Sequence, residues 1–253
     1  MAIEFKKKPG IVAYLTAGDP DLATMRDIAL AAFDNGADVI ELGVPFSDPL
    51  ADGPVIQRAS ERAVARGTRL TDVLGLAKEL RSARPKAGLV LFSYLNPVVR
   101  MGMTAFCVRA AEAGVDGVLL TDMIVEEAGE YLEAMREHKL APVFLAAPTS
   151  PDARLKAIAG VSQGFVYAIS RVGITGTQQK IAGDASELVT RLRQFTKLPI
   201  AVGFGISNAE HVRAVGEFAD AAVIGSALVA LIEKTPQAEA ASAVGRFIAG
   251  LRA

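Results

Sequence analysis

Short apolar runs alternate with longer amphipathic segments along the whole chain, and this pattern limits the folds that the sequence can adopt. Eight of the runs are apolar on both faces, which is typical of strands in a parallel sheet that helices cover. These predicted strands are residues 11–15, 39–44, 88–94, 117–120, 142–146, 165–169, 200–202 and 221–224. The segments between them, such as residues 22–35, 125–138 and 209–218, have helical periodicity. Eight strand–helix units predict an α/β fold in which residues 1–253 form one domain, a single (β/α)8 or TIM barrel, with a doubly wound open sheet as the alternative.

A similar corner precedes three of the predicted strands. The corners are Asn35-Gly36-Ala37-Asp38, Ala113-Gly114-Val115-Asp116 and Phe218-Ala219-Asp220. Gly36 and Gly114 are expected to end the preceding helices in the left-handed conformation. The pattern fits either an internal repeat or a general preference of small residues and aspartate for corners.

Charge and composition exclude several classes of protein. The 27 Lys and Arg residues balance 28 Asp and Glu, and 51% of the residues are hydrophobic, so the chain is neither disordered nor an electrostatic binder of nucleic acid. The longest nearly uncharged stretch, residues 221–232, is well short of the roughly 18 residues of a membrane span, and the N-terminal residues have no apolar core of a signal peptide. The sequence predicts a soluble, cytoplasmic protein that binds no membrane.

Cysteine and histidine give little sign of metal or nucleophilic chemistry. Cys107 is the one cysteine, which excludes an internal disulfide and a multi-cysteine metal site, and its apolar neighbours favour a packed side chain. His138 is expected at the end of a helix and His211 on the surface of another, and neither has a second ligand at metal-binding spacing. No metal site is predicted.

Glu41 lies in the middle of an apolar predicted strand, on the same face as Val39 and Gly43. Burial of an unpaired carboxylate raises its pKa toward neutrality, which suits a group that both gives and takes protons. The alternative is a structural glutamate satisfied by backbone donors or a buried cation. Asp48 and Asp52 follow in a loop rich in Pro and Gly, where turn formation is an alternative role for both.

Glycine-bearing turns follow the seventh and eighth predicted strands, at residues 203–207 and 224–227. Backbone N–H groups and helix N-termini hold a phosphate at this place in many barrels, so the two turns predict a phosphate site that needs no Arg or Lys. Residues 170–178 follow the sixth strand and contain Gly173 and Gly176, which are typical of a mobile lid. An ordinary long loop is the alternative there.

Residues 41–54, with the sequence ELGVPFSDPLADGP, resemble the signature of the tryptophan synthase α subunit family. The resemblance continues through residues 15–20 (LTAGDP), 173–176 (GITG), 203–205 (GFG) and 225–226 (GS), and covers nearly the whole chain in order. It implies cleavage of indole-3-glycerol phosphate to indole and glyceraldehyde 3-phosphate, a retro-aldol reaction that needs no cofactor in this chain.

The resemblance also implies roles for individual residues. Glu41 is the acid and base of the proton transfers, and Asp52 is the second catalytic carboxylate, which hydrogen-bonds the indole N–H and stabilises the protonated ring. Packing in the barrel core is the alternative role for the aromatic and apolar members of the substrate-binding set. The set comprises Tyr167, which positions the substrate, the lid residue Thr175, the phosphate contacts Gly176, Gly205, Gly225 and Ser226, and the indole-pocket residues Tyr14, Phe92, Leu119, Thr121 and Phe204.

The family works as an α-β-β-α heterotetramer, which implies a tryptophan synthase beta subunit as the partner. The pyridoxal phosphate of the assembly belongs to that partner, and indole passes to it through an internal tunnel. The loop with Pro45 and Asp48, and the segment around Asn96-Pro97, match the surfaces that face the partner.

The sequence departs from the family at three places. Only about ten residues precede the first predicted strand, so the N-terminal helix that often plugs the barrel base is missing or vestigial. Ile124 replaces a common proline, and residues 178–180 (QQK) differ from the usual continuation of the lid. Two other interpretations therefore stay open: a stand-alone lyase that releases free indole, and a barrel that acts only as an allosteric activator of a beta subunit.

Overall fold

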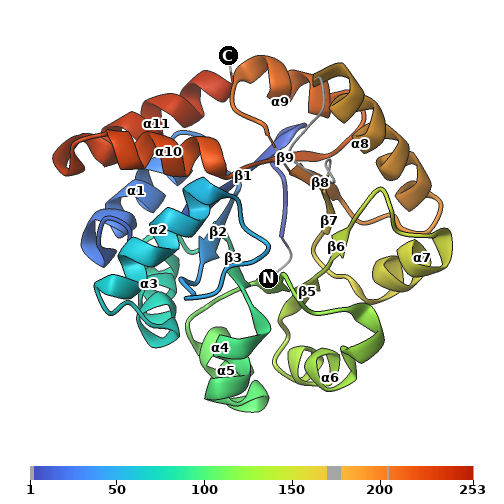
Figure 1. Cartoon of the computed structure of the whole chain (residues 1–253), viewed down its shortest axis with the longest axis horizontal. Coiled ribbons are helices and arrows are strands. Elements are labelled where there is room, and N and C mark those ends of the chain that lie inside the picture. Colours follow the sequence, from blue (N-terminus) through green and yellow to red (C-terminus); the bar gives the residue numbers. More distant parts are fainter. Residues whose placement is uncertain (1–2, 170–177, 204, 253) are drawn as a thin grey trace.

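The chain alternates strands and helices throughout, and the strands form a ring that the helices surround (Figure 1). The computed structural model describes residues 3–169, 178–203 and 205–252. The strands are β1 (Gly10–Thr16), β2 (Val39–Gly43), β3 (Gly88–Ser93), β4 (Gly117–Leu120), β5 (Ala141–Val143), β6 (Leu145–Ala146), β7 (Val166–Ile169), β8 (Ile200–Gly203) and β9 (Ala221–Ile224). The helices are α1 (Leu22–Asp34), α2 (Pro54–Ala65), α3 (Leu70–Ala83), α4 (Leu95–Met101), α5 (Met103–Glu112), α6 (Gly129–Glu137), α7 (Asp152–Val161), α8 (Gln178–Arg193), α9 (Ala209–Gly216), α10 (Ser226–Lys234) and α11 (Ala240–Leu251), with short 3-10 turns η1 (Val125–Glu127) and η2 (Gln237–Glu239).

The sheet is a closed barrel of parallel strands, as predicted. Its order is β5-β4-β3-β2-β1-β9-β8-β7-β6, and β5 and β6 are two parts of the single predicted strand 142–146. Phe144 separates them, yet its carbonyl still accepts a hydrogen bond from Tyr167 N at 3.1 Å. Both ends of the sheet therefore belong to one stretch of chain, which closes the ring and excludes the open doubly wound sheet.

One predicted helix differs in detail. Residues 125–138 are not continuous, because Ala128 has a ψ of 8° and separates η1 from α6. The predicted helices 22–35 and 209–218 are confirmed as α1 and α9, and α9 ends at Gly216.

Alternate residues of the strands fill the interior of the barrel. The inward side chains form one buried cluster, and the outward side chains pack under the helices. The fully packed interior forms the lower part of the barrel, so it is a core rather than a pore. Its members include Val12, Val39, Val90, Leu119, Val143, Phe165, Ala201, Ala221 and Val223.

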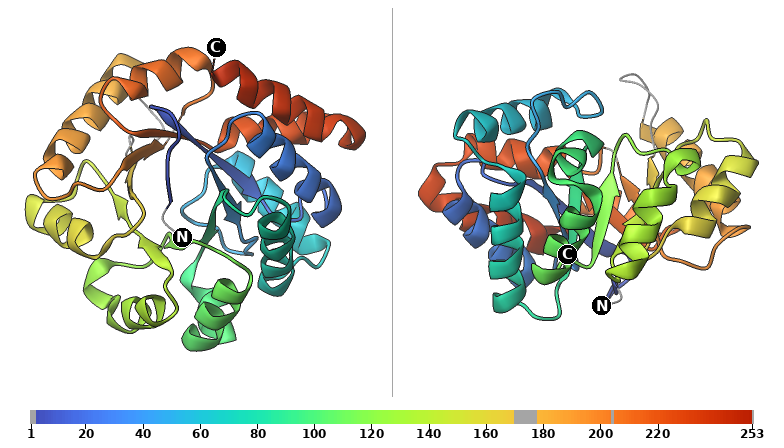
Figure 2. Two further views of the ribbon diagram at one scale, coloured as in Figure 1. Left: turned by 180° about the vertical axis from the view of Figure 1, so that it is seen from behind. Right: turned by 90° about the horizontal axis from the view of Figure 1, so that it is seen from below.

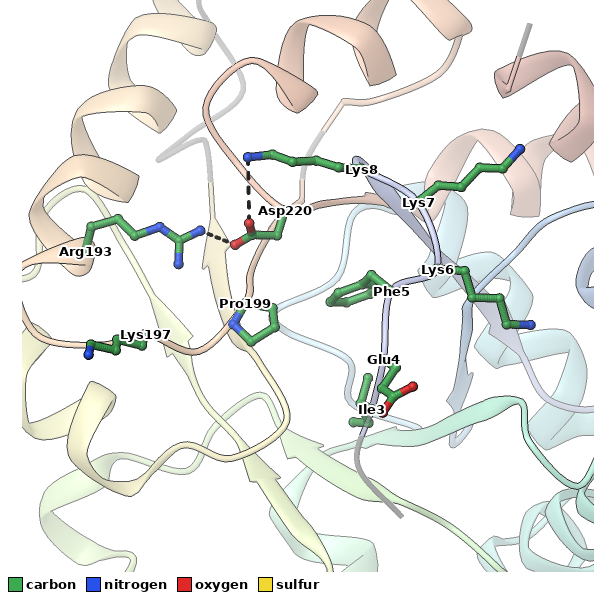
Figure 3. A pocket seen from close by; sticks show the side chains of 10 residues that line it. All are labelled: Ile3, Glu4, Phe5, Lys6, Lys7, Lys8, Arg193, Lys197, Pro199 and Asp220. Atoms are coloured by element: carbon green, nitrogen blue, oxygen red, sulfur yellow. Dashed lines mark hydrogen bonds and ion pairs between the residues drawn. The ribbon is translucent and has the colours of Figure 1, made fainter.

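The N-terminal segment runs across the base of the barrel in extended form (Figure 2) and lines a pocket there (Figure 3). Ile3 is buried in the interior cluster, and the ring of Phe5 packs edge-on against Phe165 at a centroid distance of 6.1 Å. A Cβ at Gly164 would lie 2.8 Å from Cδ1 of Ile3, so the small residue is required for this close approach. Residues 3–5 therefore cover part of the base of the barrel.

The three predicted corners share one geometry at the base of the barrel. Asp38, Asp116 and Asp220 each accept a backbone hydrogen bond from a neighbouring strand and pair with an arginine. The partners are Ile11 N (2.9 Å) and Arg252 for Asp38, Leu89 N (2.9 Å) and Arg81 for Asp116, and Ile200 N (2.8 Å) and Arg193 for Asp220. These contacts fasten each corner to the preceding strand, β1, β3 or β8, and so help to fix the strand register.

Both predicted glycine caps are confirmed. Gly36 has a φ of 113° and Gly114 has a φ of 76°, which are conformations that side chains rarely adopt.

Candidate active site

A cavity of about 460 Å³ opens at the carboxyl ends of the strands. Most of the residues predicted from the sequence line it. They are Glu41, Asp52, Tyr14, Phe92, Thr121, Tyr167, Gly205, Gly225 and Ser226. Leu119 does not line the cavity, because it points into the packed interior below. Thr175, Gly176 and Phe204 lie outside the described residues.

Glu41 is a buried carboxyl group with no partner among the described residues. It lies on β2 between Tyr14 of β1 and Val90 of β3, and its exposed fraction is 1%. Neither carboxylate oxygen has a hydrogen-bond partner among the described residues, so the structural alternative, in which donors or a cation satisfy it, fails there. Burial raises the pKa of Glu41 to about 8. A carboxylic acid in this place can exchange a proton near neutral pH.

Asp52 reaches the same cavity from the loop between β2 and α2. Its Oδ2 accepts a hydrogen bond from the hydroxyl of Tyr94 at 3.0 Å, so the carboxylate is not a turn-forming group of its own loop. Burial raises the pKa of Asp52 to about 6, and the hydrogen bond from Tyr94 opposes that rise. Between pH 6 and pH 8, therefore, Glu41 is protonated while Asp52 is ionised. One cavity then contains both a carboxylic acid and a carboxylate.

Tyr94 is a site residue that the sequence did not identify. It follows β3, is buried, and its hydroxyl also accepts a hydrogen bond from Ala51 N at 2.9 Å. Its position at the carboxyl end of a barrel strand is typical of a site residue, and this was the signal in the sequence. Its hydrogen-bond partner Asp52 lies 42 residues away, so the contact itself could not be predicted.

Two tyrosines rise from the strands over glycines of the neighbouring strands. The hydroxyl of Tyr14 lies over Gly43, and that of Tyr167 lies over Gly203. Phe92 packs edge-on against Tyr14 with a centroid distance of 5.0 Å, which gives the cavity an aromatic wall. Burial raises the pKa values of both tyrosines well above 10, so their hydroxyls are neutral donors.

The glycine-bearing turns after β8 and β9 form the other side of the cavity. Asn208 caps α9 by accepting a hydrogen bond from His211 N at 2.9 Å, whereas no side chain caps α10, which begins at Ser226 after Gly225. The first N–H groups of α10 therefore remain available to an anion at the edge of the cavity. Among the described residues that line the cavity there is no Lys or Arg.

The cysteine and the two histidines considered in the sequence lie outside the cavity and make structural contacts. Cys107 is buried 3.9 Å from the sulfur of Met135, and burial raises its pKa to about 11. His138 is the C-cap of α6, and His211 receives a hydrogen bond from Ser207 N at 3.3 Å. The described ranges contain no group of three His, Cys, Asp or Glu side chains that could hold a metal, and no helix within them is long and apolar enough to cross a membrane.

Exposed apolar side chains follow three neighbouring strands at the carboxyl end of the barrel, on two loops and one helix. Leu50 is 83% exposed after β2, Val99 is 59% exposed on α4 after β3, and Ile124 is 44% exposed after β4. Asp48 is exposed as well.

The chain is similar to a family of known proteins over nearly its full length. The family model described as tryptophan synthase alpha chain matches residues 1–249. The tryptophan synthase alpha chain of Cupriavidus taiwanensis is 47% identical over 251 residues, which are 99% of this chain and 95% of that protein. The tryptophan synthase alpha chain of Burkholderia lata is 47% identical over 252 residues, which are 100% of this chain and 93% of that protein.

Solved structures of tryptophan synthase are similar to this chain in fold as well as in sequence. A chain from the tryptophan synthase a2b2 complex of the hyperthermophile Pyrococcus furiosus superposes with a TM-score of 0.90 and 40% identity, and the alignment covers 97% of this chain and 98% of that one. Tryptophan synthase subunit alpha from Legionella pneumophila superposes with a TM-score of 0.89 and 34% identity, and the alignment covers 98% of this chain and 92% of that one.

Proposed function

Because the chain belongs to the tryptophan synthase alpha chain family, we propose that Glu41 and Asp52 catalyse its reaction in the cavity at the carboxyl ends of the strands. The chain is the alpha subunit of tryptophan synthase, a lyase that cleaves indole-3-glycerol phosphate to indole and glyceraldehyde 3-phosphate. The observation that carries the proposal for the residues is the pair of carboxyl groups, one unpaired and one held by Tyr94, that line one cavity.

Glu41 carries the proton through the reaction. As a carboxylic acid it gives its proton to C3 of the indole ring, and its carboxylate then takes the proton of the glycerol hydroxyl on the carbon bonded to C3. The oxygen of that hydroxyl forms the aldehyde, the carbon–carbon bond breaks, and its electron pair restores the aromatic ring. Glu41 ends the cycle protonated, so no other reactant is needed. Its raised pKa, about 8, supports this double role.

Asp52 stabilises the charge that develops on the ring. Protonation at C3 leaves a positive charge that extends to the indole nitrogen, and an ionised carboxylate that accepts the N–H hydrogen bond offsets it. With a pKa of about 6, Asp52 is ionised at neutral pH, and the hydrogen bond from Tyr94 fixes the direction of its carboxylate.

The other lining residues hold the two ends of the substrate. Tyr14, Phe92 and Thr121 enclose the indole ring, and Tyr167 positions the substrate with its hydroxyl. The lid residues Thr175 and Gly176 and the pocket residue Phe204 complete the set. The amides of Gly205, Gly225 and Ser226, with the uncapped start of α10, bind the phosphate.

The partner is a tryptophan synthase beta subunit in an alpha–beta–beta–alpha assembly, to which the alpha subunit passes its indole. We infer that this chain carries no cofactor of its own and that pyridoxal phosphate belongs to the beta subunit. We further propose that residues 1–253 work as one catalytic barrel in the cytoplasm. The exposed Asp48 and Leu50, and the segment of Asn96 and Pro97 with Val99, form the surface that faces the partner.

Indole release from indole-3-glycerol phosphate by the purified chain, alone and with a beta subunit, tests the proposal. Slow release alone with strong stimulation by the beta subunit is the expected result. Fast release that the beta subunit leaves unchanged would indicate a stand-alone lyase. No release in either condition from folded protein would leave the chain as an allosteric activator and would overturn the catalytic roles.

A further inference from the structure

We propose that Tyr94 is a positioning residue that couples the partner-facing helix α4 to the carboxylate of Asp52, so that docking of the beta subunit sets the orientation of that carboxylate. The inference rests on the function proposed above and names the side chain through which the partner acts on this site.

The first link joins Tyr94 to α4. Tyr94 is the N-cap residue of this helix, with extended backbone angles (φ −93°, ψ 160°). The next residue, Leu95, donates its N–H to Oδ1 of Asp122 at 2.7 Å, which ties the start of α4 to the end of β4. Because Tyr94 is the N-cap residue, a displacement of α4 moves the backbone from which its ring extends, and the bond to Asp122 holds that backbone in place relative to β4.

The second link joins Tyr94 to the loop between β2 and α2. Its hydroxyl accepts from Ala51 N at 2.9 Å and donates to Oδ2 of Asp52 at 3.0 Å. Its ring lies against Phe46 with a centroid distance of 5.2 Å and an interplanar angle of 34°. Among the described residues, Tyr94 is the side chain that donates to the carboxylate of Asp52, and this bond sets the direction of that carboxylate.

The two linked segments are those that offer apolar side chains to a partner. Leu50 lies on the loop next to Ala51, and Val99 lies on α4, and both are more than half exposed. Burial of both side chains by a beta subunit is favourable. The beta subunit would then contact the loop that carries Asp52 and also the helix that Tyr94 caps. The length and direction of the Tyr94–Asp52 hydrogen bond therefore depend on the relative position of these two segments.

The hydrogen bond has a chemical consequence that a merely structural contact lacks. It stabilises the ionised form of Asp52 and lowers its pKa against the effect of burial. Besides Tyr94, the titratable groups that act on this region of the cavity are Glu41, Tyr14 and Tyr167, and all of these are neutral at neutral pH because burial raises their pKa values. Loss of the Tyr94 hydroxyl should therefore raise the pKa of Asp52 directly.

The test compares Tyr94→Phe with Tyr131→Phe. Tyr131 is a matched control, since its buried hydroxyl donates to Val118 O at 3.0 Å and lies away from the cavity. We would measure kcat and KM for indole release, the pH dependence of kcat/KM, and stimulation by the beta subunit. Circular dichroism melting would establish that both variants fold.

For Tyr94→Phe we expect stimulation by the beta subunit to fall about tenfold or more, and the acid limb of the pH profile to move to higher pH. Tyr131→Phe should change neither. The variant Asp122→Ala keeps Tyr94 and Asp52 but frees the start of α4, and it should lower the stimulation while kcat/KM of the isolated chain stays near that of the wild type.

Wild-type stimulation together with an unmoved acid limb in Tyr94→Phe would overturn the inference. So would an equal loss of stimulation in Tyr131→Phe, because that would show a general effect of destabilisation. Failure of the proposed function is distinct from these outcomes, since the wild-type chain would then release no indole with or without the beta subunit, and the inference would fall with it.

Discussion

The side chain of Tyr14 occupies the space that a side chain in place of Gly43 would need, so only glycine fits there. A Cβ at Gly43 would lie 2.2 Å from the hydroxyl oxygen of Tyr14, which stands opposite Glu41 on the neighbouring strand. Tyr167 and Gly203 repeat the relationship on β7 and β8, where the corresponding distance is 2.1 Å. In both pairs the glycine makes room for a tyrosine that lines the same cavity as Glu41.

Gly43→Ala should therefore displace Tyr14 and disturb the cavity. Overpacking of this kind costs about 1–3 kcal/mol of unfolding free energy, and we expect kcat for indole release to fall by more than the loss of stability explains. Gly75→Ala is the control, because a Cβ there meets nothing within 4 Å and its position inside α3 favours alanine. Denaturant unfolding and steady-state kinetics would measure both, and normal turnover in Gly43→Ala would contradict the packing argument.

Glu41→Gln should abolish proton transfer and change the pH dependence of stability. Glu41 has a pKa near 4.5 in the unfolded chain and about 8 in the fold, so between these pH values the unfolded state loses a proton that the folded state keeps. The unfolding free energy of the wild type therefore falls by about 1.4 kcal/mol per pH unit in this window from this group, whereas glutamine has no such loss.

We expect turnover of Glu41→Gln to drop by several orders of magnitude, and its stability relative to the wild type to be lowest below pH 4.5 and highest above pH 8. Denaturant unfolding at a series of pH values would show this. A stability difference that does not vary with pH would mean that the carboxyl group is not the buried acid described here.

The rate of the wild-type chain should have a bell-shaped dependence on pH. The proposed mechanism requires ionised Asp52 and protonated Glu41, so kcat/KM should rise as pH passes about 6 and fall as it passes about 8. Indole release at constant ionic strength would measure the two limbs. A profile that stays level from pH 5 to pH 9 would contradict the assignment of the acid and the carboxylate.

Asp52→Ala should impair the chemical step and leave phosphate binding intact, because Asp52 lies on the loop after β2 while the proposed phosphate site lies on the turns after β8 and β9. We expect a decrease in kcat of about a hundredfold or more, as for loss of one charge-stabilising group, with unchanged inhibition by inorganic phosphate or glycerol phosphate. An equal loss of phosphate affinity would instead make Asp52 a structural residue of the loop.

Val99→Asp should weaken binding of the beta subunit. The charge would be buried at the proposed interface on α4, whereas the isolated chain keeps its activity because Val99 is 59% exposed and outside the cavity. Val64→Asp on α2 is the control, since that valine is 39% exposed but lies on a different helix. Titration with the beta subunit would compare the affinities, and a similar loss in both variants would count against an interface at α4.

Local patterns determined much of the architecture. Runs apolar on both faces predicted the eight strands, because a strand enclosed between an inner core and a layer of helices has no polar face. A carboxylate within such a run marked Glu41, since a buried charge without a partner shifts its pKa. The glycines at Gly36 and Gly114 identified their corners, because few other residues adopt a positive φ.

Other features depended on contacts between residues that are far apart in the sequence. Asp38 pairs with Arg252 across 214 positions, and Asp52 receives its hydrogen bond from Tyr94 across 42. The division of the fifth strand at Phe144 likewise appears only when the ring closes. Periodicity shows which face of an element is buried, but closure of the barrel decides which polar groups then meet. The sequence by itself therefore determined the strands, the fold and the candidate acid, whereas the tertiary structure decided that no described side chain pairs with Glu41 and that Tyr94 donates to Asp52.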